Sequence, residues 1–326
     1  MSKRRKQALV AITVLCLGGG LLFLVLASQS PNQVTADARS LPGPSTELAG
    51  SQLIVRTVDR EDPRLNGEVF VLKGGHPRRL AGAELDCERV HFAAGRGLCL
   101  ATAETGIGYQ ATIFDSSLQE LDELQLAGLP SRARVSKDGK LGAMTVFVNG
   151  HAYLGSGSFS TTTTIVDMQT GEQVANLESF TVSKEGKPLD AVDFNFWGVT
   201  FSEDSNRFFA TLRTEGHYYL VEGDLAEGTM RVLRDRVECP SLSPDGTRIA
   251  YKSRIGDENR WQLKVLDLDT LHAHAIADRR PIDDQVEWLD DDTLVYSDGL
   301  DVYTASADGG GRPRLVLRDA TSPTAL

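Results

Sequence analysis

The sequence predicts an all-β fold, a six-bladed β-propeller preceded by one N-terminal transmembrane or signal-anchor helix. Three observations lead to this prediction. After residue 50, short runs of Val, Ile, Leu, Phe and Tyr alternate with turns rich in Gly, Asp and Pro, as in antiparallel sheets. Related turn segments recur at spacings typical of propeller blades. Before residue 28, one apolar run is long enough to cross a bilayer.

The apolar run extends from Ala8 to Ala27, twenty residues without charge, and follows the basic cluster Lys3–Lys6. A helix of this length measures about 30 Å, which matches the hydrocarbon core of a membrane. The basic cluster favours a cytoplasmic N-terminus and an extracytoplasmic location for the rest of the chain. Two interpretations stay open. One is an uncleaved, single-pass signal anchor in the cell membrane; the other is a signal peptide cleaved near Ala27, because Gly18–Gly20 weaken the helix.

Composition divides the chain into residues 1–28 as the signal segment, 29–49 as a flexible stalk and 50–326 as the propeller. The stalk is rich in Pro, Ser, Thr and Gly, which form no core of their own. The formal net charge is −11, and residues 1–28 contain four basic and no acidic residues, so residues 29–326 carry −15. Such an acidic exported domain is not expected to bind nucleic acid.

The turn repeat is clearest at residues 241–251, where Ser-Pro-Asp-Gly separates two apolar strands. Asp245 can accept hydrogen bonds from its own backbone, and Gly246 can adopt positive φ. Related segments occur at residues 91–98, 134–141, 200–208 and 287–294, with Ser205 in the glycine position of 200–208. The turn centres Gly95, Asp138, Asp204, Asp245 and Asp291 are separated by 43, 66, 41 and 46 residues. Three of these spacings suit blades of about 40–50 residues, and the longest predicts an insertion of about twenty residues in the third blade.

A second repeated element is a Gly-Gly hairpin, present in residues 73–80 and again in residues 309–315. Each copy links two predicted strands, as the connection between the third and fourth strands of a blade requires. Together with the Ser-Pro-Asp-Gly turn and the Arg-Ile-Ala-Tyr strand that follows it, this hairpin resembles the propeller repeat of the TolB family. The resemblance covers most of residues 50–320 and implies a propeller without that family's separate N-terminal α/β domain. It implies no single activity, because similar blades occur in peptidases, scaffolds and binding proteins.

The six blades are predicted to span residues 50–84, 85–128, 129–186, 187–236, 237–280 and 281–326. The first blade contains no obvious innermost strand. The tail after Leu317 is one segment that could supply it. Such a closure would join the two ends of the ring and remove free sheet edges.

The cysteines are Cys16, Cys87, Cys99 and Cys239. Export would place the last three where disulfides form. Cys87 and Cys99 are the natural pair, and whether they are bonded stays open. If they flank one tight hairpin, they lie several residues out of register and need a bend to meet. Cys239 is then an odd, buried thiol.

Motifs for catalysis, metals and cofactors are weak. The chain has no Gly-x-Ser-x-Gly elbow, which argues against a serine hydrolase. His272 and His274 share a strand face, but a catalytic zinc site needs a third ligand. Asp290–Asp292 fits a hairpin tip better than a calcium loop, and the partial dinucleotide fingerprint in residues 106–111 precedes no helix. No catalytic residue, metal ligand or cofactor is therefore predicted.

Candidate binding residues come from the third-blade insertion and from the segment that follows it. Loops on a rigid scaffold often carry binding function, and clustered aromatic residues are typical interface anchors. The candidates are His151, Tyr153, Phe159, Phe194, Phe196 and Trp197. The alternative for Trp197 is a place in the core between blades.

The favoured function is a non-enzymatic binding or scaffold protein, a monomer held at the membrane by residues 8–27. Its expected partners are envelope or membrane proteins or peptides, because the end faces and channel of a propeller gather loops from all blades into one docking surface. Two alternatives stay open. One is a propeller hydrolase or lyase with a site at the channel mouth, and the other is a protein that binds carbohydrate or an envelope polymer.

Overall fold

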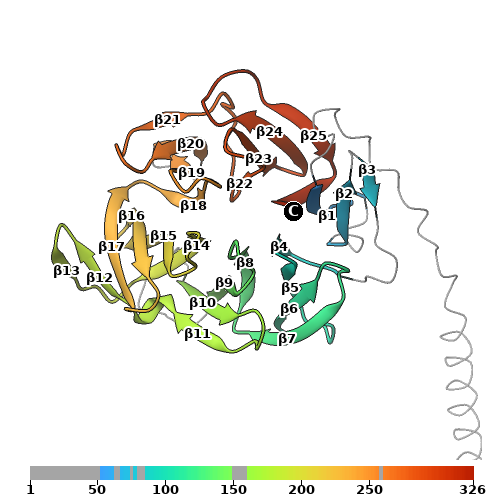
Figure 1. Ribbon diagram of the computed structural model, residues 1–326, viewed down its shortest axis with the longest axis horizontal. Helices are drawn as coiled ribbons and strands as arrows, with labels where there is room; N and C mark the ends of the chain where they lie inside the picture. The colour runs from blue at the N-terminus through green and yellow to red at the C-terminus, as the bar shows by residue number, and fades with distance from the viewer. Residues whose placement is uncertain (1–51, 62–66, 74–75, 79–84, 149–159, 257–259) are drawn as a thin grey trace, which may run out of the picture. The chain divides into compact units, whose positions relative to one another are not determined.

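A computed structural model describes residues 52–61, 67–73, 76–78, 85–148, 160–256 and 260–326. These residues form six β-sheets arranged as blades around a central channel (Figure 1). The predicted all-β, six-bladed propeller is therefore confirmed. All the described residues belong to one unit, residues 41–326.

The signal segment and the stalk, residues 1–49, lie outside the described residues and stay predictions. Within the described ranges, no helix has both the length and the apolar character needed to span a membrane.

In each of the first three blades the strands follow one another from the channel outward. Blade one contains β26 (Ala320–Ala325), β1 (Gln52–Thr57), β2 (Val69–Lys73) and β3 (His76–Arg78). Blade two contains β4 (Arg89–Ala93), β5 (Arg96–Thr102), β6 (Tyr109–Asp115) and β7 (Glu120–Leu126). Blade three contains β8 (Leu129–Val135), β9 (Leu141–Val148), β10 (Ser160–Asp167) and β11 (Gln173–Asn176).

Blade four has six strands, and blades five and six have four each. Blade four contains β14 (Asn195–Phe201), β15 (Arg207–Thr214), β16 (His217–Asp224), β17 (Thr229–Asp235), β12 (Thr181–Lys184) and β13 (Lys187–Leu189). Blade five contains β18 (Glu238–Leu242), β19 (Arg248–Arg254), β20 (Trp261–Asp267) and β21 (Ala273–Ala275). Blade six contains β22 (Glu287–Trp288), β23 (Thr293–Asp298), β24 (Asp301–Ser306) and β25 (Arg314–Arg318).

Ring closure joins β26, from the end of the sequence, to β1. The two strands pair antiparallel, with Leu53 opposite Ala325 and Thr57 opposite Ala320. The tail after Leu317 thus supplies the innermost strand of the first blade, as the sequence suggested. β26 also contacts the second blade, because Thr324 Oγ1 donates to the Val90 carbonyl at 3.2 Å. The C-terminal strand therefore holds together the first blade and its neighbour.

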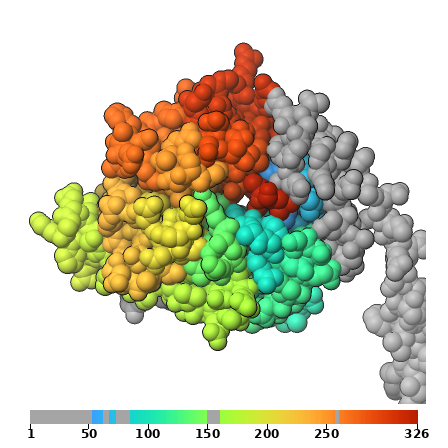
Figure 2. Space-filling view, in the orientation of Figure 1, coloured from blue at the N-terminus to red at the C-terminus, as the bar shows by residue number. Residues whose placement is uncertain are grey.

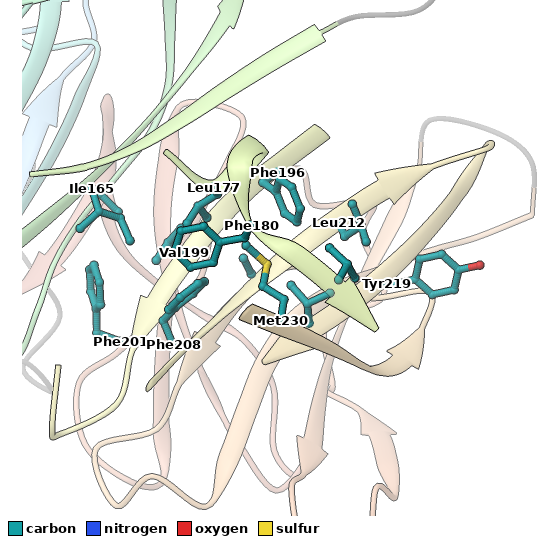
Figure 3. Close-up of a cluster of buried hydrophobic side chains, with 14 residues drawn as sticks. Ile165, Leu177, Phe180, Phe196, Val199, Phe201, Phe208, Leu212, Tyr219 and Met230 are labelled. Carbon is teal, nitrogen blue, oxygen red and sulfur yellow. The ribbon is translucent and has the colours of Figure 1, made fainter. Parts of the chain in front are cut away.

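The predicted boundary between blades three and four is wrong. Blade three ends at Asn176, and after the 3₁₀ helix η3 (Leu177–Ser179) the hairpin β12–β13 joins the outer edge of blade four, where β12 runs parallel to β17. The reason is apolar burial. Phe180 and Val182 pack with Phe208 and Met230 in one buried cluster (Figure 3). Part of the predicted insertion therefore extends blade four, while residues 149–159 lie outside the described residues.

The Ser-x-Asp turns share one hydrogen-bond pattern. Ser243 Oγ donates to Asp245 Oδ1 at 2.5 Å and accepts the Arg248 amide at 2.9 Å. Ser136 with Asp138 and Ser202 with Asp204 repeat the first of these bonds. Burial acts to raise the pKa of Asp245, but hydrogen bonds from Ser243 and Thr247 outweigh it and lower the pKa to about 2. The glycine position of the third turn holds Ser205 at φ 55°, as the repeat predicted.

Cys87 and Cys99 form a disulfide, with their Cα atoms 5.3 Å apart. The bend that this bond requires lies before β4. Cys99 is opposite Val90 in the hairpin, whereas the Cys87 amide donates to the Gly67 carbonyl of the first blade. Cys87 is therefore outside the hairpin ladder, and the chain turns back to bring the two sulfurs together. Cys239 is a buried free thiol, as predicted.

Replacing Cys87 and Cys99 with alanine should lower the free energy of unfolding by about 3 kcal/mol, because the bond closes a loop between residues 12 apart and restricts the unfolded chain. Urea denaturation of the two proteins under oxidising conditions measures this difference. Cys239→Ala is the control, since it removes a thiol and leaves the disulfide intact. Equal unfolding midpoints for the double variant and the unaltered protein would contradict the prediction.

Candidate functional site

A pocket opens into the channel between the inner strands of blades one, two, three and six. The empty space in the pocket and in the solvent at its opening is about 340 Å³. Its lining residues are Arg89, Val90, His91, Arg132, Ala133, Arg134, Asp284, Gln285, Glu287, Ser322, Pro323 and Thr324. The space-filling view shows an opening near the centre of the ring, beside the C-terminal strand (Figure 2). Charged and polar groups thus meet where the channel opens.

Strand alternation brings these charges to the channel. Arg89 and His91 are two residues apart on β4, and Arg132 and Arg134 are two apart on β8, so each pair shares one face of its strand. Val90, between the first pair, belongs to the hydrophobic core. The pairs form two layers. The outer layer is Arg89 and Arg132, and the inner layer, more deeply buried, is His91 and Arg134 with Glu287 from β22.

The inner layer is a hydrogen-bonded ion pair. Arg134 pairs with Glu287, and its Nη2 also donates to Ser241 Oγ at 3.2 Å. His91 Nδ1 accepts the Val135 amide at 3.1 Å, so Nε2 carries the ring proton and donates to Glu287 Oε2 at 3.2 Å. These contacts connect the inner strands of blades two, three, five and six.

Electrostatics fixes the charge state of the inner layer. Burial lowers the pKa of His91, and the charge of Arg134 lowers it further, so the imidazole is neutral. Burial acts to raise the pKa of Glu287, but the charge of Arg134 and the hydrogen bond from His91 outweigh it and lower the pKa to about 2. At neutral pH the inner layer is therefore one carboxylate, one guanidinium and one neutral imidazole.

The outer layer places two guanidinium groups beside one carbonyl oxygen. The Ser131 carbonyl accepts from Arg89 Nε at 2.8 Å and from Arg132 Nη1 at 2.8 Å. Burial lowers the pKa of Arg89, and the neighbouring charge of Arg132 lowers it further. Arg132 Nε also donates to the Cys239 sulfur at 3.4 Å. The mouth of the channel therefore holds two adjacent guanidinium groups on a protein that is acidic overall.

A third cation, on blade five, lies next to the outer layer. Lys252 pairs with Asp283, and its Nζ lies 4.4 Å from the centre of the Trp261 ring. Trp261 Nε1 donates to Glu238 Oε1 at 2.8 Å, which fixes the indole. Asp283 also lies 3.9 Å from Arg132, so this group adjoins the pocket. Cation–π contact and ion pairing hold these side chains in place beside the channel mouth.

The inner layer consists of hydrogen-bonded and ion-paired groups, without a free general base. Both nitrogens of His91 are engaged in hydrogen bonds, so the ring has no free lone pair with which to act as a general base for a serine or cysteine. Ser322 Oγ donates to the Val90 carbonyl at 3.1 Å. Across the part of the chain that the structure describes, no three His, Cys, Asp or Glu side chains are grouped to hold a metal ion.

The predicted binding residues that the structure describes do not line this pocket. Phe196 and Trp197 are 0% and 6% exposed on β14, which gives them a packing role. The Phe194 ring packs edge-on against Phe196 at 5.9 Å, and Trp197 packs against Tyr218 at 6.1 Å. This is the core alternative considered for Trp197. His151, Tyr153 and Phe159 lie outside the described residues, so binding by them stays a prediction.

Sequence reasoning missed the charged residues of the pocket. The available signal was the alternation Arg-Val-His at residues 89–91 and Arg-Ala-Arg at residues 132–134, where charge replaces apolar residues on one face of an inner strand. Partner residues such as Glu287 come from other blades, and their spacing along the chain reveals nothing about the contact.

Known proteins share the fold at low sequence identity. Neither a protein-family model nor a curated protein sequence matches the chain. TolB from Acinetobacter baumannii is 16% identical, with a TM-score of 0.62 over 87% of this chain and 68% of that one. A chain of the nidogen/laminin complex is 10% identical, with a TM-score of 0.56 over 85% of this chain and 98% of that one. A putative TolB from Agrobacterium tumefaciens is 13% identical, covers 85% and 98%, and has a TM-score of 0.49. The first two likenesses show the propeller fold.

Proposed function

We propose that this protein is a non-enzymatic docking propeller, tethered through residues 8–27, that binds a segment of an envelope protein or peptide at the mouth of its channel. One observation carries the proposal: two side-by-side guanidinium groups, Arg89 and Arg132, line a pocket that opens at the end of the channel. Fixed donors around a concave site provide orientation and specificity for a ligand. The engaged, neutral His91 adds no reactive group to this site.

Two features support an extracytoplasmic location. The basic cluster before the apolar run favours export of the rest of the chain. The Cys87–Cys99 disulfide is typical of proteins outside the reducing cytosol. A monomeric propeller held in this way leaves its channel accessible to partners in the envelope.

Site-specific photo-cross-linking in native cells tests the proposal. A photoreactive amino acid at Glu88, whose side chain is 47% exposed next to Arg89, should give a discrete cross-linked protein or peptide. The same amino acid at Lys140, which is 77% exposed in the turn between β8 and β9, is the matched control and should not give that product. Equal products from both positions, or none from Glu88, would contradict docking at the channel mouth.

A further inference from the structure

The two guanidinium groups of the outer layer share one hydrogen-bond acceptor. Arg89 Nε and Arg132 Nη1 each lie 2.8 Å from the same Ser131 oxygen. Arg89 Nη1 donates to the neighbouring Glu88 carbonyl at 2.8 Å. Neutral backbone carbonyls therefore hold both groups in position, but they do not neutralise the two positive charges.

Acidic side chains near the outer layer are already occupied. Asp283 lies 3.9 Å from Arg132 and also pairs with Lys252, and its own side chain is 58% exposed. Asp284 accepts the Gln285 amide at 2.9 Å and the Ser297 amide at 2.8 Å. Among the described residues Arg89 forms no ion pair within 4 Å. Glu88 is also near Arg89, but it pairs with Arg56. The three cations Arg89, Arg132 and Lys252 thus face the two carboxylates of Asp283 and Asp284, which leaves one positive charge.

A buried donor in the inner layer also lacks an acceptor. Arg134 is 7% exposed and lines the pocket, and within the described residues its Nε–H has no hydrogen-bond partner. An unsatisfied buried donor is unfavourable, so a ligand that reaches it gains affinity from satisfying it. The charge of Glu287 is balanced by its ion pair with Arg134, and His91 donates to the same carboxylate oxygen, so the inner layer adds no net negative charge that would repel an entering anion.

We infer that the channel mouth binds a carboxylate of the docked partner through the guanidinium groups of Arg89 and Arg132. This inference rests on the proposed function and names the chemistry of its ligand. A planar carboxylate matches the fork of a guanidinium and makes charge-assisted hydrogen bonds. The single surplus positive charge is balanced by a monoanion. A dianionic phosphate would bring a second negative charge that no cation balances, next to Asp283 and Asp284. The carboxylate can be a chain terminus or an acidic side chain, since the two share the same group.

Thermal unfolding of the full chain in detergent, with ligand added at constant ionic strength, tests the inference. The probes are acetate, inorganic phosphate at a pH where it is mainly a dianion, and three peptides: acetyl-Ala-Ala-Ala with a free C-terminus, its C-terminal amide, and acetyl-Ala-Asp-Ala amide. Ligands that bind only the folded protein raise its unfolding temperature in a saturable way. Acetate and at least one carboxylate peptide should do so, and the neutral amide should bind about tenfold more weakly or not at all. The peptide that binds identifies the source of the carboxylate.

Variants separate this site from general anion effects. Arg89→Gln with Arg132→Gln should abolish the saturable shift, whereas Arg207→Gln with Arg231→Gln, at side chains 52% and 64% exposed on blade four, should preserve it. If the double variant does not fold, Arg89→Gln alone should weaken binding by about tenfold, as expected for loss of charge-assisted hydrogen bonds. A larger shift with phosphate than with acetate, or an undiminished shift in the folded variants, would overturn the inference. If the Glu88 cross-link persists when both arginines are replaced, docking holds and the carboxylate inference fails.

Discussion

A chain that ends at Asp319 should lose its cooperative native fold. Such a chain lacks β26, the only partner of β1 on the channel side of blade one among the described strands. The loss includes the ladder to β1, the Ser322 and Thr324 hydrogen bonds to Val90, and the burial of Ala320 against Leu53 and Val55. At about 1 kcal/mol for each net hydrogen bond, the total approaches the 5–15 kcal/mol that holds a typical domain together. Circular dichroism with thermal unfolding measures the effect.

Two controls make the result specific to ring closure. Removal of Leu326 alone, which lies beyond β26 and is 46% exposed, should leave the unfolding temperature unchanged. A synthetic peptide of residues 318–326, added to the chain that ends at Asp319, should restore the cooperative transition, because strand addition rebuilds the same ladder. If the shortened chain unfolds at the temperature of the full chain, ring closure contributes little and the prediction is wrong.

The sequence predicted the ring because each blade repeats local information. Ser-Pro-Asp-Gly at residues 243–246 specifies its own turn through Ser243 and Asp245, and apolar alternation on either side specifies the strands. Counting the predicted strands in each blade also showed that blade one lacked an innermost strand. By contrast, β12 and β13 carry no repeat signal. Their place on blade four is decided by the burial of Phe180 against Phe208, a contact that only tertiary packing creates.

The candidate site was harder to predict because it is assembled across blades. Arg134 and Glu287 are separated by 153 residues, and each is one of many charged residues in the chain. The aromatic cluster that drew attention, Phe196 and Trp197, packs the inner strand of blade four instead. In a propeller, the inner strands combine core and channel functions on alternate faces, so aromatic content alone does not distinguish a binding surface from a core.

Glu287→Gln should destabilise the protein by about 3–5 kcal/mol, because it leaves the buried charge of Arg134 without its counter-ion. Urea denaturation at neutral pH measures the change. Arg231→Gln is the control: it also removes an ion pair, with Glu222, but from a side chain that is 64% exposed, and should cost less than about 1 kcal/mol. Arg134→Met combined with Glu287→Met should recover part of the loss, since removing both charges removes the unpaired one.

The ion pair between Arg134 and Glu287 also makes the free energy of unfolding depend on pH. The pKa of Glu287 falls from an ordinary value of 4.5 to about 2 on folding, so the unfolded chain binds its proton more readily. The stability from Glu287 is therefore fully present above about pH 5 and is lost as the pH falls toward 2. The free energy of unfolding should decline less steeply with acid in Glu287→Gln than in the unaltered protein, because the variant has no proton to take up at this position. Parallel acid profiles for the two proteins would show that Glu287 is not held as a buried carboxylate by Arg134 and His91.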